Sequence, residues 1–275
     1  MPELPEVETI KRTLEKKLTG LTIVDVDINT PKIIRAPAPE EFTRSVKGCK
    51  ITRLRRRGKY LLIYLSRDKV MIIHLRMTGR LVYAEPADPL PRHTHIIFQL
   101  SNGCELRFAD MRRFGRVSLA QVQDLNQLKV IKELGPEPLE QDFTTSYLRK
   151  TLKRKRVRIK SLLLDQTFIA GLGNIYADEA LHRARLHPER VACSLTPREI
   201  AKLHSSIVEV LQEGIANRGT SMRDYVDGNG RAGDYQSLLR VYSREGERCL
   251  QCGTPVARVK VGGRSSYYCP ACQKP

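Results

Sequence analysis

Four cysteines near the C-terminus have the types and the spacing of a metal site. They form two CxxC pairs, Cys249 with Cys252 and Cys269 with Cys272, and 16 residues separate the pairs. Each pair can turn two thiolates towards one ion while the residues between form a hairpin, so the spacing suits tetrahedral Zn²⁺. A disulfide framework would instead need an oxidising compartment. Because four thiolates leave no open position on the ion, we expect one structural zinc.

The first residues, Met1-Pro2-Glu3-Leu4-Pro5-Glu6, allow two interpretations. In the structural one, proline suits the first turn of a helix and glutamates suit its positive end. In the chemical one, removal of Met1 leaves Pro2 with a secondary amine, and an α-amine, with an ordinary pKa of about 7.7 to 8, is partly neutral and nucleophilic near pH 7. Glu3 could then serve as general acid or base. The residues alone leave both interpretations open.

Two basic segments and a glycine turn indicate anion binding. Residues 149–160 contain eight basic side chains and no acidic one, and residues 53–59 form a second basic cluster. In Gly171-Leu-Gly173-Asn174 the glycines allow close backbone approach, and Asn174 opens a predicted helix whose N-terminal amides can bind an anion. The alternatives are that the charges are only a solvated surface and that the glycines are only a tight connection.

The composition favours a globular protein with a polyanionic partner. The 275 residues contain 48 Lys and Arg against 30 Asp and Glu, a formal net charge of +18, which favours nucleic acid. The N-terminus lacks the pattern of a secretory signal, and the apolar runs are too short to cross a bilayer. We therefore expect a cytosolic protein without a membrane partner.

The hydrophobic pattern predicts an α+β protein of several domains. Apolar residues at steps of three and four predict a helix from Pro2 to about Leu18, and short runs between about 21 and 120 predict an antiparallel β-sandwich. The prolines within residues 134–138 mark a domain boundary. We place a β-sandwich domain at 1–134, a helical domain at 135–236 and a four-cysteine finger at 237–275.

The middle of the chain is predicted to be helical. Residues 146–165 form the first helical stretch, and a later one begins at Thr196, which with Glu199 has the pattern of a capping box. Residues 217–236 are rich in Gly and Asp and poor in apolar side chains, which predicts a long mobile loop.

Several motifs, in order along the chain, resemble the bacterial formamidopyrimidine-DNA glycosylase family. They cover essentially the whole chain: MPELPEVE, RRGKYL around Lys59, HLRMTG from His74, DMRRFG from Asp110, LLLDQTFIAGLGNIYADE from Leu162, and the terminal finger. The start reads MPELPE rather than the MPEGPE typical of endonuclease VIII, which favours oxidised purines over oxidised pyrimidines. The resemblance implies an N-terminal helix with an antiparallel β-sandwich, a helix-two-turn-helix domain and a C-terminal zinc-finger β-hairpin.

The resemblance also implies a reaction: excision of 8-oxoguanine and formamidopyrimidines from double-stranded DNA, followed by strand cleavage. Pro2 would attack C1′ of a flipped nucleotide to give an iminium intermediate, with Glu3 assisting sugar opening and proton transfer before β,δ-elimination. Glu6 would support this site. Lys59 matches the family lysine that touches the phosphate near the lesion and assists catalysis, although simple neutralisation of the DNA backbone explains it equally well.

Further residues match the family's DNA contacts. Met77, Arg112 and Phe114 match the residues that fill the gap left by the extruded nucleotide, where they offset part of the unstacking cost. The residues that match the family's phosphate contacts are His74, Lys160, Asn174 and Arg264, and the resemblance also counts Arg264 among the catalytic residues. The segment that corresponds to the family's loop over the everted base contains Thr220, Ser221, Arg223 and Tyr225.

The chain departs from the family pattern at two positions. Thr78 stands where some members carry a glutamate, so a contact from that side chain to the lesion is in doubt. Ser243 replaces the glycine usual before the finger, which alters the entry turn but spares zinc binding.

Two other functions remain open. One is an endonuclease VIII-like glycosylase for oxidised pyrimidines, and the other is a non-catalytic, zinc-dependent nucleic-acid-binding protein. For the favoured function we expect a monomer that acts on oxidised double-stranded DNA at the nucleoid of a bacterial cytosol.

Overall fold

The computed structural model describes residues 1–274, which separate by their contacts into two compact units. The first unit contains residues 1–132 together with 217–236, and the second contains 133–216 and the chain from 237 onwards. Residues 217–236 thus pack with the N-terminal part of the chain, because their backbone finds hydrogen-bond partners on the first helix. The three-domain division made from the sequence stays a prediction.

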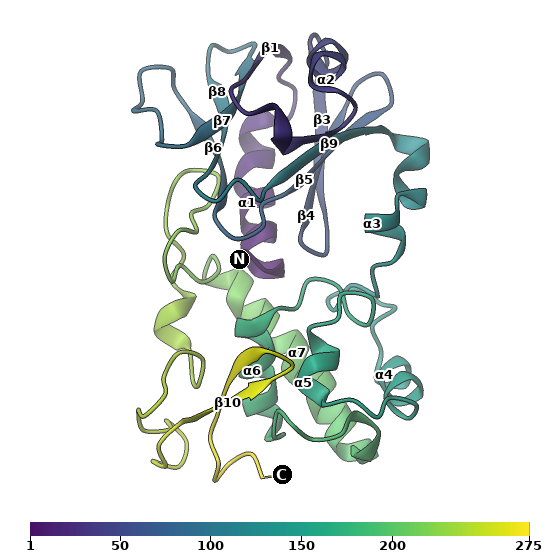
Figure 1. Cartoon of the computed structure of the whole chain (residues 1–275), viewed down its shortest axis with the longest axis vertical. Helices are drawn as coiled ribbons and strands as arrows, with labels where there is room; N and C mark the ends of the chain where they lie inside the picture. Colours follow the sequence, from purple (N-terminus) through teal and green to yellow (C-terminus); the bar gives the residue numbers. More distant parts are fainter. Residues whose placement is uncertain (275) are drawn as a thin grey trace. The chain divides into compact units, whose positions relative to one another are not determined.

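Two β-sheets build the first unit (Figure 1). One sheet has the strand order β1-β7-β8-β6 and the other β2-β9-β5-β4-β3, with antiparallel neighbours except for the parallel pair β2 and β9. A single hydrophobic cluster contains side chains of both sheets, which confirms the predicted β-sandwich. The strands are β1 (Ile23–Ile28), β2 (Ile34–Ala36), β3 (Ile51–Arg57), β4 (Tyr60–Leu65), β5 (Lys69–His74), β6 (Gly79–Ala84), β7 (Thr94–Leu100), β8 (Glu105–Asp110) and β9 (Arg116–Gln121).

Helix α1 (Leu4–Leu18) contacts strands of both sheets and lies among them in Figure 1. Its apolar side chains at helical spacing are buried, as predicted. The helix begins at Leu4 rather than Pro2 because Glu3 is its extended N-cap residue. The short elements of this unit are α2 (Pro39–Val46), α3 (Lys129–Lys132) and the 3-10 helices η1 (Pro31–Ile33) and η2 (Val122–Gln127).

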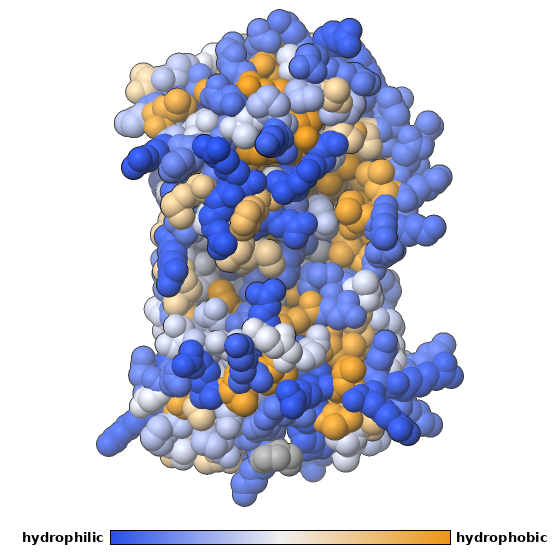
Figure 2. Space-filling view, viewed as in Figure 1, coloured by the Kyte–Doolittle hydropathy of each residue, from blue (hydrophilic) through white to orange (hydrophobic). Residues whose placement is uncertain are grey.

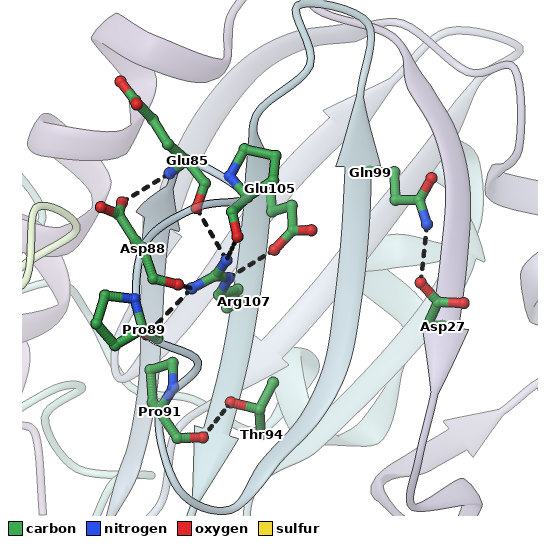
Figure 3. Close-up of polar contacts among 10 residues, drawn as sticks. Asp27, Glu85, Asp88, Pro89, Pro91, Thr94, Gln99, Glu105 and Arg107 are labelled. Atoms are coloured by element: carbon green, nitrogen blue, oxygen red, sulfur yellow. Dashed lines mark hydrogen bonds and ion pairs between the residues drawn. The ribbon is translucent and has the colours of Figure 1, made fainter.

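A buried arginine organises the connection between β6 and β7 (Figure 3). The guanidinium of Arg107 donates to the Glu105 carboxylate at 2.6 Å and to the carbonyl oxygens of Glu85 and Asp88 at 2.9 and 3.0 Å. Because the planar guanidinium has five donors, one side chain can fix several carbonyls at once. Hydrogen bonds from Arg107 therefore hold this loop in place, although the loop forms neither helix nor strand.

The second unit combines helices with a two-stranded hairpin. Its elements are α4 (Thr145–Leu152), α5 (Ile159–Leu163), α6 (Asn174–Ala184), η3 (Ala192–Ser194), α7 (Pro197–Ala216), β10 (Ala257–Val261) and β11 (Arg264–Tyr268), with η4 (Tyr235–Leu238) where the chain passes from one unit to the other. The predicted capping box at the start of α7 is confirmed, since Thr196 and Glu199 bond each other's backbone amides.

The prediction of an unbroken helix over residues 146–165 is wrong, because the chain leaves helical structure between α4 and α5. The backbone there bonds to a distant segment instead: Ala192 N donates to Val157 O at 2.8 Å, and Ile159 N donates to Arg190 O at 2.7 Å. Six residues between the helices, 153–158, include five cations, and like charges at helical spacing disfavour a helix.

The face of the molecule drawn in Figure 2 is largely hydrophilic. Figure 2 shows hydrophilic side chains over much of the visible face, with smaller hydrophobic patches among them. Among residues 1–274, every helix is too short or too polar to cross a bilayer.

We expect Arg107→Met to lower the free energy of unfolding by about 3 kcal/mol, because it leaves Glu105 and several carbonyls without their donor. Chemical denaturation would measure the loss, and limited proteolysis would show faster cleavage within residues 85–93. Arg107→Lys keeps the charge beside Glu105 but cannot reach the several carbonyls, so its free energy of unfolding should lie between those of the unsubstituted protein and Arg107→Met. Equal stability of all three proteins would contradict the role given to the guanidinium.

Candidate active site and zinc centre

The N-terminal residues of the predicted active site lie together at the start of α1. Pro2 is buried, and Glu3 and Glu6 are almost fully buried. Glu3 and Glu6 form a reciprocal capping box, in which Glu6 Oε2 accepts the Glu3 N–H at 2.7 Å. The structural interpretation of these residues is thus confirmed.

Glu6 also binds the segment of residues 217–236, which the same unit contains. Its Oε1 accepts the Thr220 N–H at 2.7 Å. A Cβ on Gly219 would lie 2.7 Å from that oxygen, and Gly219 has φ +78°, so the close approach requires glycine. The Tyr225 hydroxyl donates to the Arg218 carbonyl at 3.0 Å, and burial together with the charge of Glu6 raises the pKa of Tyr225.

The other predicted loop residues differ in exposure. The Ser221 N–H donates to Gln236 Oε1 at 2.9 Å, and its hydroxyl donates to the Tyr225 carbonyl at 2.8 Å, so both groups have partners inside the loop. Arg223 is exposed, whereas Thr220 and Tyr225 are buried. A base edge could bind Thr220 or Ser221 only if these internal bonds exchanged. The predicted loop is therefore anchored on α1, which its composition did not reveal.

Lys59 and His74 are both buried in the first unit, and Tyr60, which follows Lys59, pairs with His74 across β4 and β5. His74 Nδ1 accepts the Arg76 N–H at 3.0 Å, and its ring packs edge-on against Tyr60 at 4.7 Å. Burial, then Arg76 and Lys59, lower the pKa of His74 to about 3. The neutral ring accepts at Nδ1 and so carries its proton on Nε2. Its Nε2–H is the donor that a phosphate contact of His74 would use.

The three predicted gap-filling residues come together on two neighbouring turns. Arg112 Nη1 lies 3.0 Å from Met77 Sδ, and the Arg112 guanidinium stacks over the Phe114 ring at 4.8 Å. Met77 and Phe114 are 45% and 43% exposed, so they are not core residues. Two large apolar side chains and a cation thus project from one edge of the sandwich.

Lys160 has a different environment from the predicted one. Its side chain is 0% exposed, and Nζ contacts Asp178 Oδ1 at 2.6 Å and the Ser265 carbonyl at 2.9 Å. Burial raises the pKa of Asp178 while Lys160 lowers it, and the Tyr267 N–H donates to the other carboxylate oxygen. A direct phosphate contact by Lys160 would require breaking a buried ion pair, which is costly, so this geometry argues for a positioning role.

Asn174 contacts the β10–β11 hairpin of the second unit, and Arg264 belongs to that hairpin. Asn174 begins α6, as predicted, and its Nδ2 donates to the Ser265 carbonyl at 3.0 Å. Arg264 begins β11 and is exposed. Asn174, Lys160 and the residue after Arg264 therefore share one hydrogen-bonded cluster.

Sequence reasoning missed the adjacent buried carboxylates of Asp178 and Glu179. Glu179 accepts the backbone N–H groups of Arg240, Val241 and Tyr242 at 2.9 to 3.0 Å. These bonds attach the chain before the finger to α6. An acidic pair between the apolar residues of a helix was the available signal.

The four predicted cysteines converge on one point, with their sulfur atoms all within 4.8 Å of one another. Cys249 Sγ also lies 3.6 Å from His182 Nε2 on α6. A set of four thiolates fits tetrahedral Zn²⁺ without an open position. Ser243, where the family usually has glycine, adopts φ +62°, which explains why glycine is favoured there.

The free energy of unfolding should fall as the pH is lowered from 7 to 5, in part through His74. The pKa of His74 in the folded protein, about 3, lies below the ordinary value of 6.5. As the pH falls, His74 therefore binds a proton in the unfolded chain before it does so in the folded one, and acid favours the unfolded chain. His74→Gln should remove this contribution, which approaches about 1.4 kcal/mol per pH unit below the ordinary pKa. Denaturation curves of both proteins at several pH values test this, and parallel pH profiles would refute it.

Cys252→Ser should release the zinc and loosen the finger while the β-sandwich stays folded, because metal binding supplies about 10–16 kcal/mol of folding free energy in such units. Metal analysis and hydrogen exchange of residues 246–274 would measure this. Cys193→Ser, at an exposed cysteine outside the cluster, is the matched control. Full zinc content in the Cys252 variant would exclude the proposed ligand set.

Three family models match consecutive parts of the chain. They are the formamidopyrimidine-DNA glycosylase N-terminal domain at residues 1–117, the corresponding H2TH domain at 134–226, and the zinc finger found in FPG and IleRS at 246–275. The last match and the cysteine cluster identify the centre as a site for one structural zinc ion.

Whole-length relatives agree with these matches. The formamidopyrimidine-DNA glycosylase of Pelotomaculum thermopropionicum is 62% identical over 100% of this chain and 99% of its own length. A Lactococcus lactis FPG mutant in complex with Fapy-dG-containing DNA has a TM-score of 0.94 at 38% identity, with 100% of both chains covered. The wild-type L. lactis protein with oxidised-pyrimidine-containing DNA has a TM-score of 0.93 at 37% identity, again over 100% of both chains. The chain is therefore an enzyme of the formamidopyrimidine-DNA glycosylase family.

Proposed function

We propose that this DNA glycosylase excises oxidised purines, 8-oxoguanine and formamidopyrimidines, from double-stranded DNA and then cuts the strand at the resulting site. The amine of Pro2, freed by removal of Met1, attacks C1′ of the flipped nucleotide, and the damaged base leaves as the N-glycosidic bond breaks. The iminium adduct then loses the 3′ and 5′ phosphates in successive eliminations. We place this reaction in the bacterial cytoplasm, where the chromosome lies.

The observation that carries this proposal is the burial of two carboxylates next to Pro2. Glu3 follows Pro2 directly, and Glu6 holds the Glu3 N–H. A carboxyl group fixed beside the nucleophile can protonate the sugar oxygen and later take up a proton from C2′. Glu6 would fix the position of Glu3, since its own carboxylate accepts two backbone N–H groups. Lys59 would bring positive charge to the phosphate near C1′.

The remaining residues would hold the DNA. Met77 and Phe114 would enter the stack and Arg112 would face the orphaned base. Arg264 and Asn174 would bind phosphates, while Lys160 would position the hairpin carbonyl that Asn174 also binds. The finger would present Arg264 as part of a metal-stabilised hairpin. Arg223 and the loop of residues 217–236 would cover the everted base.

Oxidised pyrimidines are the second candidate substrate class. The L. lactis protein has been crystallised with DNA that contains an oxidised pyrimidine, so a member of this structural group accommodates such a base. The third possibility left open by the sequence, a purely DNA-binding protein, is set aside because the chain belongs to an enzyme family.

Borohydride should trap a covalent complex between the enzyme and DNA that contains 8-oxoguanine, and Pro2→Gly should weaken trapping about tenfold or more, since the positioned secondary amine is lost. Intact-mass measurement first establishes that Met1 is absent. Gel electrophoresis of the trapped complex and peptide mapping of the adduct provide the readout.

Pro5→Gly is the matched control, because it changes the same helix terminus but leaves the terminal amine. DNA binding by Pro2→Gly should remain close to that of the unsubstituted enzyme. An adduct on a lysine, or undiminished trapping by Pro2→Gly, would remove the proposed nucleophile. Faster release of thymine glycol than of 8-oxoguanine opposite cytosine would instead overturn the substrate class.

A further inference from the structure

The turn that carries Met77 and the turn that carries Arg112 and Phe114 both cross from one sheet of the sandwich to the other. Residues 75–78 connect β5 to β6, and residues 111–115 connect β8 to β9. Since β5 pairs with β9 and β6 pairs with β8, the two crossings lie side by side. Their relative position depends on what joins them between the sheets.

A buried hydrogen-bond network joins the two turns. The Thr78 hydroxyl donates to Asp110 Oδ1, and Thr78 Oγ1 accepts the Arg112 N–H at 3.1 Å. The carboxylate also accepts the N–H of Arg112 at 3.2 Å and that of Gly115 at 2.7 Å. Thr78 and Asp110 are only 9% and 1% exposed. One hydroxyl and one carboxylate thus fix the backbone at Arg112 and at Gly115, which lie on either side of Phe114.

The buried network lies beneath exposed apolar side chains. The side chains of Met77 and Phe114 are nearly half exposed. The backbone beside Phe114, at Arg112 and Gly115, is held by the buried hydrogen bonds. A Cβ on Gly115 would lie 2.5 Å from the Phe108 ring, so this turn also packs closely on the core. An apolar side chain inserts well between stacked nucleobases only if the turn that carries it is already rigid. A mobile turn would lose conformational entropy on insertion, and that loss would weaken binding.

We infer that Thr78 and Asp110 are positioning residues that lock the two turns together, so that Met77, Arg112 and Phe114 enter the duplex as one unit. Thr78 thereby acts on base extrusion through the turns and not through a contact to the lesion. The inference rests on the proposed gap-filling role of those three side chains.

Thr78→Val tests this, because valine keeps the shape of threonine and removes the hydroxyl. The excision rate under single-turnover conditions should fall about tenfold for 8-oxoguanine paired with cytosine, since a misplaced wedge must still open the pair. It should change by less than about twofold when the same lesion stands opposite an abasic site, where little extrusion work remains. Thr78→Ser, which restores a hydroxyl, should recover the rate on the paired lesion.

Two measurements separate this inference from a loss of folding and from failure of the proposed function. Borohydride trapping on DNA with a preformed abasic site needs no base extrusion, so Thr78→Val should trap normally. Equal losses on paired, unpaired and abasic DNA would show a merely structural role and overturn the inference. Met77→Ala and Phe114→Ala should show the same contrast between paired and unpaired lesions. If they do and Thr78→Val does not, only the positioning role fails; if they do not, the gap-filling role itself fails.

Discussion

The first unit depends on the carboxylate of Glu6. Two backbone N–H groups, one from Glu3 and one from Thr220, donate to it at 2.7 Å each. A buried carboxylate is tolerable only when such donors replace its water, so the charge requires both segments to be in place. The Glu6 carboxylate thus joins Glu3 to Thr220, more than 200 positions away in the sequence. These two hydrogen bonds fix the backbone next to Pro2 and next to Gly219.

The same device recurs elsewhere in the chain. Asp110 collects backbone N–H groups from the turn it precedes, and Glu179 collects three from the segment before the finger. Each hydrogen bond to a charged group contributes about 1.5–3 kcal/mol, so a few of them organise backbone that forms neither helix nor sheet. The chain has a formal net charge of +18. Its buried carboxylates hold the loops, while many of its cationic side chains remain at the surface, where they can bind DNA.

The sequence predicted the features that depend on local periodicity and spacing. Cysteine spacing predicted the zinc ligands, apolar steps predicted α1, and Thr196 with Glu199 predicted the start of α7. It failed where a distant partner decides, since residues 153–158 bond to the backbone near Arg190. It also gave no sign that Lys160 is buried in an ion pair with Asp178, and the phosphate contact of Lys160 stays a prediction. Helical propensity and positive charge describe a segment by itself, whereas these outcomes depend on which acceptor the fold brings to it.

The two interpretations of the N-terminal residues turn out to be compatible rather than competing. The helix cap uses the backbone N–H and the carboxylates of Glu3 and Glu6, and the first helical bond runs from Val7 N to Glu3 O. The nitrogen of Pro2 has no hydrogen while Met1 is attached, so it can donate nothing to that cap. Removing Met1, which is half exposed, would therefore create a nucleophilic amine without breaking a hydrogen bond donated by that nitrogen. The cap fixes Glu3, the proposed general acid, and leaves the nitrogen of Pro2 available for the proposed chemistry.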